Sequence, residues 1–142
     1  MESRKFPGTV DSIDQIRHHI KEISAEAGLN KKAAYNLMLA ADEIATNIIL
    51  YGYDESGIEG ELNVLHAQTE HELIVIFEDQ APPFDPLRRE LPDEEDLTKP
   101  LEERAIGGLG IFLTVRGVDD FSYEYIDNTN RNIFKMKLDS TG

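Results

Sequence analysis

Two apolar patterns with helical spacing occupy the first third of the chain. In residues 11–27 the apolar positions recur every three or four residues, and Gly28 follows as a C-terminal cap. A second stripe runs through residues 31–50, after Asn30, whose side chain suits an N-cap. The apolar positions of the two stripes are Ile13, Ile16, Ile20, Ile23 and Ala27, then Leu37, Ala40, Ala41, Ile44 and Ile48. We therefore predict two amphipathic helices joined by a short connection.

Strand patterns begin after a polar turn at residues 54–57. Four ranges have the composition of strands: 60–69, 72–79, 120–127 and 131–138. The first two are expected to form a hairpin at Glu70-His71, and the last two to join across a turn at 128–130. The stretch from Leu73 to Phe77 is continuously apolar, which is typical of a well-buried strand.

A long proline-rich connection separates the two strand pairs. Residues 80–106 include the acidic run at 93–96, and loops of this length in a compact domain are usually functional lids or disordered segments. A short apolar helix is expected at 109–117. The order of the elements predicts an α+β two-layer sandwich, a mixed and mostly antiparallel sheet with about three helices on one face.

Length and charge narrow the classes of function. The 142 residues fit one domain, and the lack of cysteine excludes both disulfides and thiolate metal sites. The formal net charge of −14 argues against nucleic acid and anionic membranes as partners. The N-terminus has no apolar signal core, and no run approaches the roughly 20 apolar residues of a membrane span. We expect a cytoplasmic protein with a single domain, 1–142.

The second predicted helix carries a candidate pair for phosphate chemistry. Glu43 and Asn47 are four residues apart and therefore lie on one helix face. An amide oxygen can ligate Mg²⁺, and a carboxylate one turn away can orient or deprotonate a nucleophile. Taken alone, such a pair is more often an ordinary feature of a helix surface. Asn47 is less easily explained in this way, because it lies close to the apolar stripe, where an amide needs a partner.

Two further features point to a nucleotide. Asp79 ends the most apolar strand, where a carboxylate can accept a hydrogen bond from the exocyclic amine of adenine, although Asp before a proline-rich turn is also ordinary turn chemistry. Gly107, Gly108 and Gly110 allow the backbone to approach phosphates, and the helix after them adds N–H groups and a positive dipole end.

In this order, the three features resemble the GHKL superfamily of ATPases and kinases. The resemblance rests on Glu43-x-x-x-Asn47, Asp79-x-Ala81-x-Pro83-Phe84-Asp85-Pro86 and Gly107-Gly108-Leu109-Gly110-Ile111-Phe112-Leu113. It covers essentially the whole chain. Within the superfamily the chain is most similar to the anti-sigma-factor serine/threonine kinases, the bacterial switch kinases, because of Phe84-Asp85-Pro86 and the segment Pro-Leu-Glu-Glu-Arg at 100–104.

The resemblance implies a Bergerat-type fold that binds ATP and Mg²⁺. Glu43 would be the general base that activates a Ser or Thr hydroxyl of a protein substrate, Asn47 would hold Mg²⁺, and Asp79 would read adenine. Residues 87–106 would form an ATP lid, with Arg104 as a phosphate contact. Because the protein is acidic, we expect this lid to be disordered until the γ-phosphate orders it. The full set of implied nucleotide contacts is Asn47, Asp79, Ala81, Pro83, Phe84, Arg104, Gly107, Gly108, Leu109, Gly110 and Asn132.

The same resemblance implies protein partners. They would be an anti-sigma-factor antagonist as substrate, a sigma factor that is sequestered, and a second copy of the chain in a homodimer. The alternative is a nucleotide-binding or protein-binding module of the same fold without phosphoryl transfer. The catalytic half of a histidine kinase is disfavoured, because the chain has no room for a hairpin bearing a phosphoacceptor histidine.

Three positions depart from the family pattern. Ala81 stands where the family usually has Gly, so its methyl group is expected to crowd the base or to restrict φ. Asn132 stands where many relatives have a Thr that helps to hold adenine, a role that an amide can also fill. Tyr51 stands where His is frequent, and it carries no assigned role.

Overall fold

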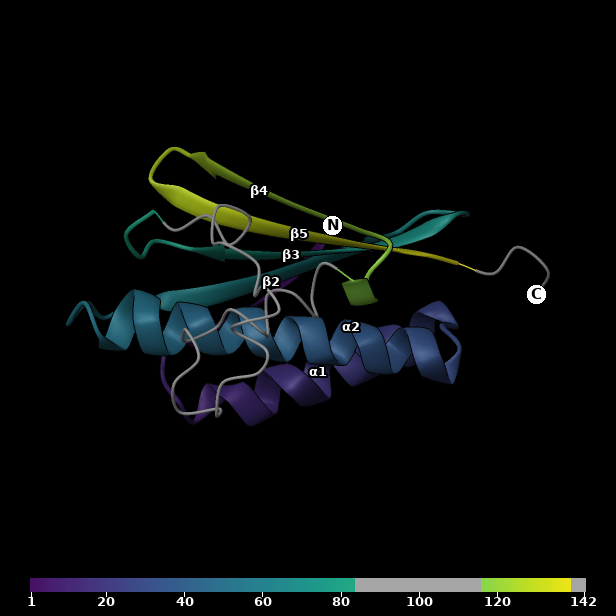
Figure 1. Cartoon of the computed structure of the whole chain (residues 1–142), viewed down its shortest axis with the longest axis horizontal. Helices are drawn as coiled ribbons and strands as arrows, with labels where there is room; N and C mark the ends of the chain where they lie inside the picture. The colour runs from purple at the N-terminus through teal and green to yellow at the C-terminus, as the bar shows by residue number, and fades with distance from the viewer. Residues whose placement is uncertain (84–115, 139–142) are drawn as a thin grey trace, which may run out of the picture.

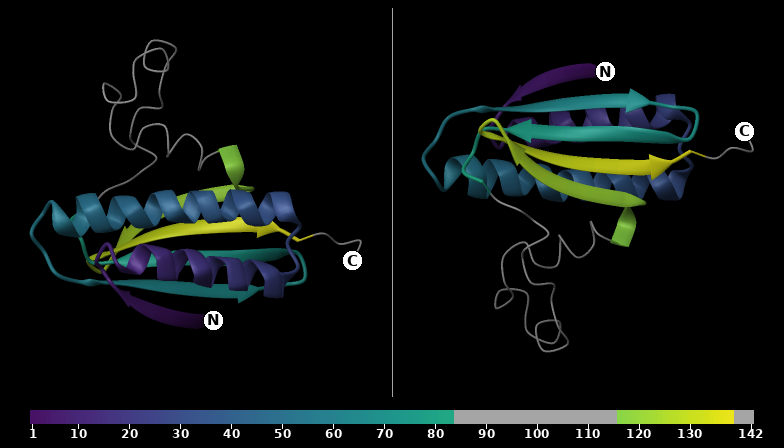
Figure 2. Two further views of the ribbon diagram at one scale, coloured as in Figure 1. Left: turned by 90° about the horizontal axis from the view of Figure 1, so that it is seen from below. Right: turned by 90° about the horizontal axis from the view of Figure 1, so that it is seen from above.

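A five-stranded sheet and two long helices form two layers in the computed structural model, which describes residues 1–83 and 116–138 (Figure 1). The strands are β1 (Glu2–Pro7), β2 (Glu61–Gln68), β3 (Glu72–Asp79), β4 (Asp120–Ile126) and β5 (Thr129–Lys137). Their order across the sheet is β1-β2-β3-β5-β4, and the four pairings are all antiparallel. The helices α1 (Ser12–Ala27) and α2 (Lys31–Thr46) lie side by side on one face of the sheet (Figure 2). The predicted α+β sandwich is confirmed.

The helix ends follow the chemistry that the sequence indicated. Helix α1 stops at Gly28, which has a left-handed backbone with φ of 80°, and the Gly28 N–H donates to the carbonyl of Ala25. Helix α2 starts at Asn30, whose side chain accepts a hydrogen bond of 2.8 Å from the Ala33 N–H. The short connection at 28–30 therefore turns the chain back and sets the two helices antiparallel.

Helix α2 does not end in the regular form that the stripe at 31–50 predicted. From Asn47 it continues as a wider π-helix, η1 (Asn47–Asp54), and the turn follows only at residues 55–57. Ile48, Ile49 and Tyr53 of η1 are buried. Apolar spacing does not reveal the wider winding, which is often found at functional sites.

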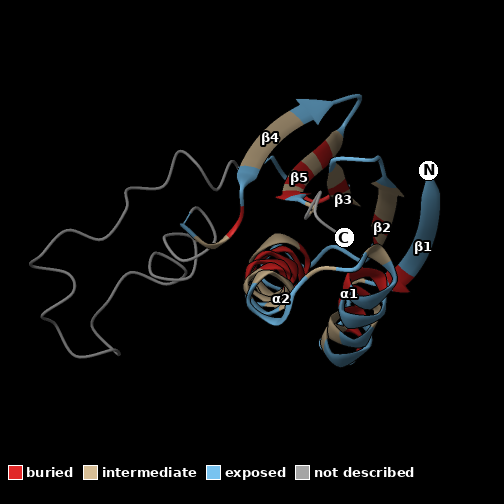
Figure 3. Cartoon of the chain, turned by 90° about the vertical axis from the view of Figure 1, so that its right-hand side faces the viewer, coloured by how far each residue is buried: buried red, intermediate tan, exposed pale blue. Residues whose placement is uncertain are grey.

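The core lies between the helices and the inner face of the sheet, where the buried surfaces of both layers meet (Figure 3). Aromatic rings connect the central strands, with the Phe77 and Phe134 ring centroids 5.3 Å apart in an edge-to-face arrangement. Leu37, Ile44 and Val75 pack in the same cluster and are almost fully buried.

Strand β1 was not predicted. It pairs with β2 in the register Phe6 to Leu62, and Phe6 is its buried apolar residue. A six-residue segment with one buried apolar side chain has no period-two pattern, so its strand structure depends on pairing with β2 rather than on a local signal.

The turn between β4 and β5 lies earlier than predicted. Asp127 and Asn128 form a two-residue hairpin loop with φ values of 52° and 61°, as type I′ turns require. The predicted turn at 128–130 is therefore wrong, and β5 begins at Thr129. This shift places Asn130 within the strand, on the inward face together with Asn132.

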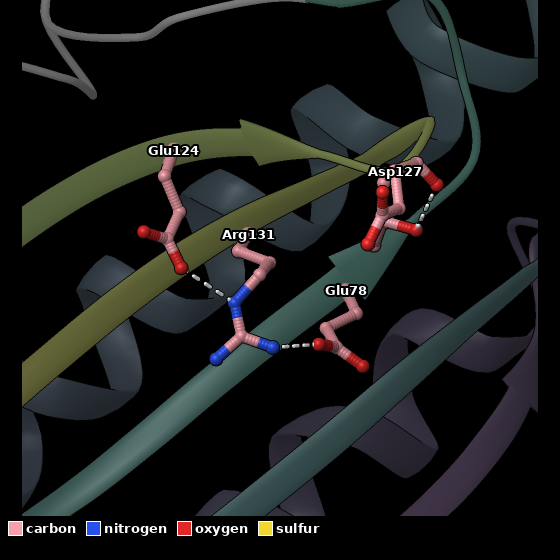
Figure 4. A network of polar contacts seen from close by, with 5 residues as sticks. Glu78, Glu124, Asp127 and Arg131 are labelled. Carbon is pink, nitrogen blue, oxygen red and sulfur yellow. Dashed lines mark hydrogen bonds and ion pairs between the residues drawn. The ribbon is translucent and has the colours of Figure 1, made fainter.

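The outer face of the sheet carries a polar network across three strands (Figure 4). Arg131 on β5 forms ion pairs with Glu78 on β3 and with Glu124 on β4, which are its direct cross-strand neighbours. Opposite charges in this position favour one register over slipped pairings.

The predicted lid at 87–106 lies outside the described residues. So does most of the helix predicted at 109–117, although Arg116 and Gly117 are helical. In the two described segments, 1–83 and 116–138, no helix is long and apolar enough to cross a membrane.

Candidate functional site

A cavity of about 150 Å³ lies where α2 and η1 face the ends of β3 and β5. The lining residues are Ile44, Asn47, Ile48, Tyr51, Gly52, Asp79, Ala81, Pro82, Pro83, Asn130 and Asn132. The wall is mainly apolar and holds a few polar groups from separate elements, as is usual in sites for small molecules.

Asp79 is the acidic group of this cavity. It is the last residue of β3 and is 1% exposed. Its Oδ1 accepts hydrogen bonds from the Ala81 N–H and from Asn130 Nδ2, both at 3.0 Å. Its Oδ2 is buried and has no hydrogen-bond partner among the described residues. One carboxylate oxygen is thus held in place, and the other is available to a ligand.

The environment of Asp79 also changes its acidity. Burial raises the pKa from its ordinary value of 3.8 to about 6, and the hydrogen bonds from Asn130 and Ala81 act in the opposite direction. The group is therefore mainly ionised at neutral pH, although the side chain that carries the charge is buried.

Asn130 is the functional residue that sequence reasoning missed. Its Nδ2 donates to Asp79 and also to the Ala81 carbonyl at 2.9 Å, while the Tyr123 hydroxyl donates to its Oδ1. The turn predicted at 128–130 includes this residue, and a turn residue is not expected to face a cavity. The available signal was a period of two: Asn130, Asn132, Phe134 and Met136 occupy every second position of β5, and all four are buried.

Two buried amide side chains complete the polar part of the cavity. Asn47, the first residue of η1, is 5% exposed, and neither its Oδ1 nor its Nδ2 has a partner among the described residues. Asn132 on β5 is buried, and its Oδ1 is likewise unpaired within this part of the chain. Buried amides without partners cost free energy, so these groups are suited to a polar ligand in the cavity.

Glu43 lies one helical turn before Asn47 and does not line the cavity. It is half-buried, and its pKa is raised by this burial and by the neighbouring charge of Asp42. Asp42 itself is paired with Arg17 of α1 at 2.9 Å. A carboxylate with a raised pKa accepts protons more readily near neutral pH.

Comparison with known proteins places the chain in a family. A family model for the histidine kinase-like ATPase domain matches residues 6–138. The chain belongs to the histidine kinase-like ATPase family.

Two individual proteins from this comparison agree with the family. The chain is 28% identical over 107 residues to the serine-protein kinase RsbW of Halalkalibacterium halodurans, and the match covers 75% of the chain and 65% of that relative. Its fold is similar to that of the catalytic domain of histidine kinase ThkA, with a TM-score of 0.50 at 14% identity and coverage of 96% and 97%.

Ala81 occupies the position where the family pattern is expected to have Gly, and its backbone is not strained there. Ala81 has no left-handed φ, so the expected restriction of its backbone does not arise. Its methyl group packs against η1, where a Cβ added to Gly52 would lie 3.0 Å from the Ala81 Cβ. Whether this methyl group crowds a base in the cavity stays a prediction.

The structure brings together five of the residues that the sequence predicted as nucleotide contacts. They are Asn47, Asp79, Ala81, Pro83 and Asn132. Phe84, Arg104, Gly107, Gly108, Leu109 and Gly110 lie outside the described residues. Tyr51, which had no assigned role, also lines the cavity. Within 1–83 and 116–138 there is no cluster of three His, Asp or Glu side chains suited to a metal.

Proposed function

We propose that the chain binds ATP with Mg²⁺ in this cavity and is a serine/threonine protein kinase that acts on an anti-sigma-factor antagonist. One observation carries the proposal. Three buried polar side chains, Asn47, Asp79 and Asn132, come from three different elements and line one apolar cavity, and each keeps an atom that has no partner within residues 1–83 and 116–138. An apolar cavity with a few convergent polar groups suits a flat heteroaromatic base with polar edges.

Asp79 would recognise the base. Its Oδ1 is already occupied by Ala81 and Asn130, so the ionised Oδ2 is the atom that would accept a hydrogen bond from the exocyclic amine of adenine. Asn132 is on the neighbouring strand β5 and would offer its Oδ1 and Nδ2 to the same ligand.

Asn47 would hold the metal through its side-chain oxygen, the kind of ligand that Mg²⁺ prefers. When bound, Mg²⁺ would neutralise phosphate charge. This chain has a formal net charge of −14, so we expect nucleotide binding to depend strongly on the metal.

Glu43 would be the general base. Its position one turn before Asn47 and its raised pKa suit a carboxylate that takes the proton from a Ser or Thr hydroxyl of the substrate protein. The similarity to the serine-protein kinase RsbW supports this choice of substrate. The phosphate contacts from Arg104, Gly108 and Gly110, and the lid at 87–106, remain part of the proposal.

The proposed partners are a sigma factor and its antagonist, as the resemblance of the motifs implies, and we also propose a cytoplasmic location and a single domain of residues 1–142. A homodimer is also proposed.

The second candidate function is a binding module without phosphoryl transfer. Ala81 favours that candidate, because its methyl group occupies part of the cavity wall.

A transfer assay separates the two candidates. Wild-type protein, Glu43→Gln and Asn47→Ala are incubated with Mg-ATP and a purified antagonist protein, and phosphoserine or phosphothreonine is detected by mass spectrometry. Calorimetry measures nucleotide binding by the same three proteins, with and without Mg²⁺. The kinase proposal predicts that Glu43→Gln binds like wild type and loses at least about a hundredfold in transfer rate, whereas Asn47→Ala loses binding. Magnesium-dependent binding without transfer in the wild type would instead favour the module.

A further inference from the structure

Tyr53 is a buried tyrosine that does not line the proposed ATP site. It lies near the C-terminal end of η1 and is 1% exposed. Its hydroxyl donates a hydrogen bond of 2.8 Å to the Glu61 carbonyl at the start of β2. The same hydroxyl accepts a hydrogen bond of 2.9 Å from the N–H of Gln80, the residue that follows Asp79. A single phenol oxygen therefore connects η1 with two strands of the sheet.

The ring of Tyr53 is fixed by two glycines. A Cβ added to Gly8 would lie 2.6 Å from Tyr53 Cδ2, and a Cβ added to Gly60 would lie 2.5 Å from Tyr53 Cε1. Neither distance leaves room for a side chain, so both glycine positions are needed for the ring to lie where it does. The Gly8 N–H also donates to the Gly60 carbonyl at 2.8 Å, which closes the same region. The position of the phenol oxygen is thus determined by close packing.

The contact with Gln80 occurs where the chain leaves β3 and enters the wall of the cavity. The peptide group between Asp79 and Gln80 is held by Tyr53, and the next N–H, from Ala81, binds Asp79 Oδ1. Because peptide groups are planar, holding the Gln80 N–H also fixes the carbonyl side of Asp79. The direction of the Asp79 carboxylate therefore depends on Tyr53 from the backbone side and on Asn130 from the side-chain side.

We infer that Tyr53 is a positioning residue for Asp79, and that it sets the preference of the cavity for a base with an exocyclic amine. This inference rests on the proposed function, in which Asp79 Oδ2 recognises adenine. Tyr53 does not line the cavity, so its effect on the ligand would pass through the Gln80 peptide group. A site with a precisely placed hydrogen-bonding group discriminates strongly against analogues that lack the matching group.

The test compares ATP with inosine triphosphate, which has a carbonyl oxygen in place of the exocyclic amine and a hydrogen on N1, with the same ribose and triphosphate. Calorimetry with Mg²⁺ gives the dissociation constants of both nucleotides for wild type, for Tyr53→Phe and for a control, Tyr35→Phe. Tyr35 is exposed on α2, so its variant makes the same chemical change without these contacts. Tyr53→Phe keeps the ring between the glycines and removes only the hydroxyl.

We expect Tyr53→Phe to weaken ATP binding about tenfold, as is typical for the loss of a well-placed hydrogen bond, and to change inosine triphosphate binding less than about twofold. Tyr35→Phe should match wild type with both nucleotides. An equal loss for the two nucleotides, or no loss for either, would overturn the inference. A wild-type protein that binds both nucleotides equally would instead overturn the role of Asp79, so the two failures are distinguishable.

A second measurement covers the case in which Tyr53→Phe does not fold. Hydrogen exchange of the Gln80 amide in wild-type protein reports the contact directly. The inference predicts strong protection of this amide, because the Gln80 N–H donates its hydrogen bond to the buried hydroxyl oxygen of Tyr53. Exchange at the rate of an open loop would contradict it.

Discussion

Asp79 shows how a single residue of this chain is placed for binding rather than for stability. The carboxylate lies in an interior site, where an ionised group loses hydration that its two hydrogen bonds replace only in part. The raised pKa of about 6 is the measure of that cost. The uncharged side chains of Asn47 and Asn132 also lose stability through burial, because their buried amide atoms lack partners among the described residues.

The first prediction concerns Asp79→Asn. Between about pH 4 and pH 6 the folded protein holds a proton on Asp79 that the unfolded chain has released, because the pKa is 3.8 when unperturbed and about 6 in the fold. The free energy of unfolding therefore falls as pH rises through this window and stays lower above it. Asn removes the charge and keeps an oxygen for Ala81 and Asn130. We expect the variant to be more stable than wild type by about 1–3 kcal/mol at pH 8.

Urea unfolding at pH 4 and at pH 8, without nucleotide, checks this prediction. The difference between variant and wild type should be small at pH 4 and should appear at pH 8. Asp120→Asn, a matched change at an exposed carboxylate on β4, should show no such pH-dependent gain. A variant that is less stable than wild type at pH 8 would mean that the Asp79 charge is well compensated in the fold.

At the scale of elements, the features that the sequence predicted were those with a local cause. Helices α1 and α2 have continuous apolar stripes, and capping residues mark where α1 ends, at Gly28, and where α2 begins, at Asn30. Strand β1 and the wide helix η1 have no local cause of this kind. The first depends on pairing with β2, and the second buries Ile48, Ile49 and Tyr53 without a periodicity that marks its wider winding.

The hairpin of β4 and β5 shows how a small error in an element affects the site. Moving the turn by one or two residues changes which side chains face the helices, because side chains alternate along a strand. The predicted turn at 128–130 hid the role of Asn130. Asp79 was predictable because it ends an apolar strand, and Asn47 because it lies one helical turn from Glu43 and close to an apolar stripe. The contacts between Asn130, Tyr53 and the residues after Asp79 join distant parts of the chain, and no pattern within one segment reports them.

The second prediction concerns this turn. Asn128 has a φ of 61°, a conformation that Gly adopts freely and that a residue with a Cβ adopts at a cost. Asn128→Ala should therefore lower the free energy of unfolding by about 1 kcal/mol, while Asn128→Gly should leave it unchanged or raise it. Thermal unfolding of the two variants checks the order, and an Ala variant as stable as the Gly variant would argue against a type I′ turn.

At the scale of the whole molecule, the two helices cover one face of the sheet and leave the other face without a helix among the described residues (Figure 3). That outer face has an apolar row in register across the central strands, made by Leu65, Ile76 and Ile133. Ile76 is 4% exposed, while its two neighbours in the row are half-buried. A second copy of the chain is the partner that we propose for this face.

The third prediction follows for the proposed homodimer. Ile133→Glu places a charge at the β5 end of the apolar row and should shift the protein from dimer to monomer in sedimentation velocity experiments. Lys5→Glu, a charge change at the edge strand β1, serves as the control and should leave the dimer intact. A wild-type protein that sediments as a monomer at all concentrations would contradict the proposed assembly.

The central claim is that the cavity between η1 and the ends of β3 and β5 binds adenine nucleotides through Asp79. Its most direct test is a calorimetric titration of Mg-ATP into wild type and Asp79→Asn at pH 8, where the Asp79 carboxylate of the wild type is ionised. We predict that the wild type binds and that the variant, although folded and more stable, binds at least about a hundredfold more weakly, because a carboxylate that accepts from the amine is lost. Equal affinities for the two proteins would contradict the account.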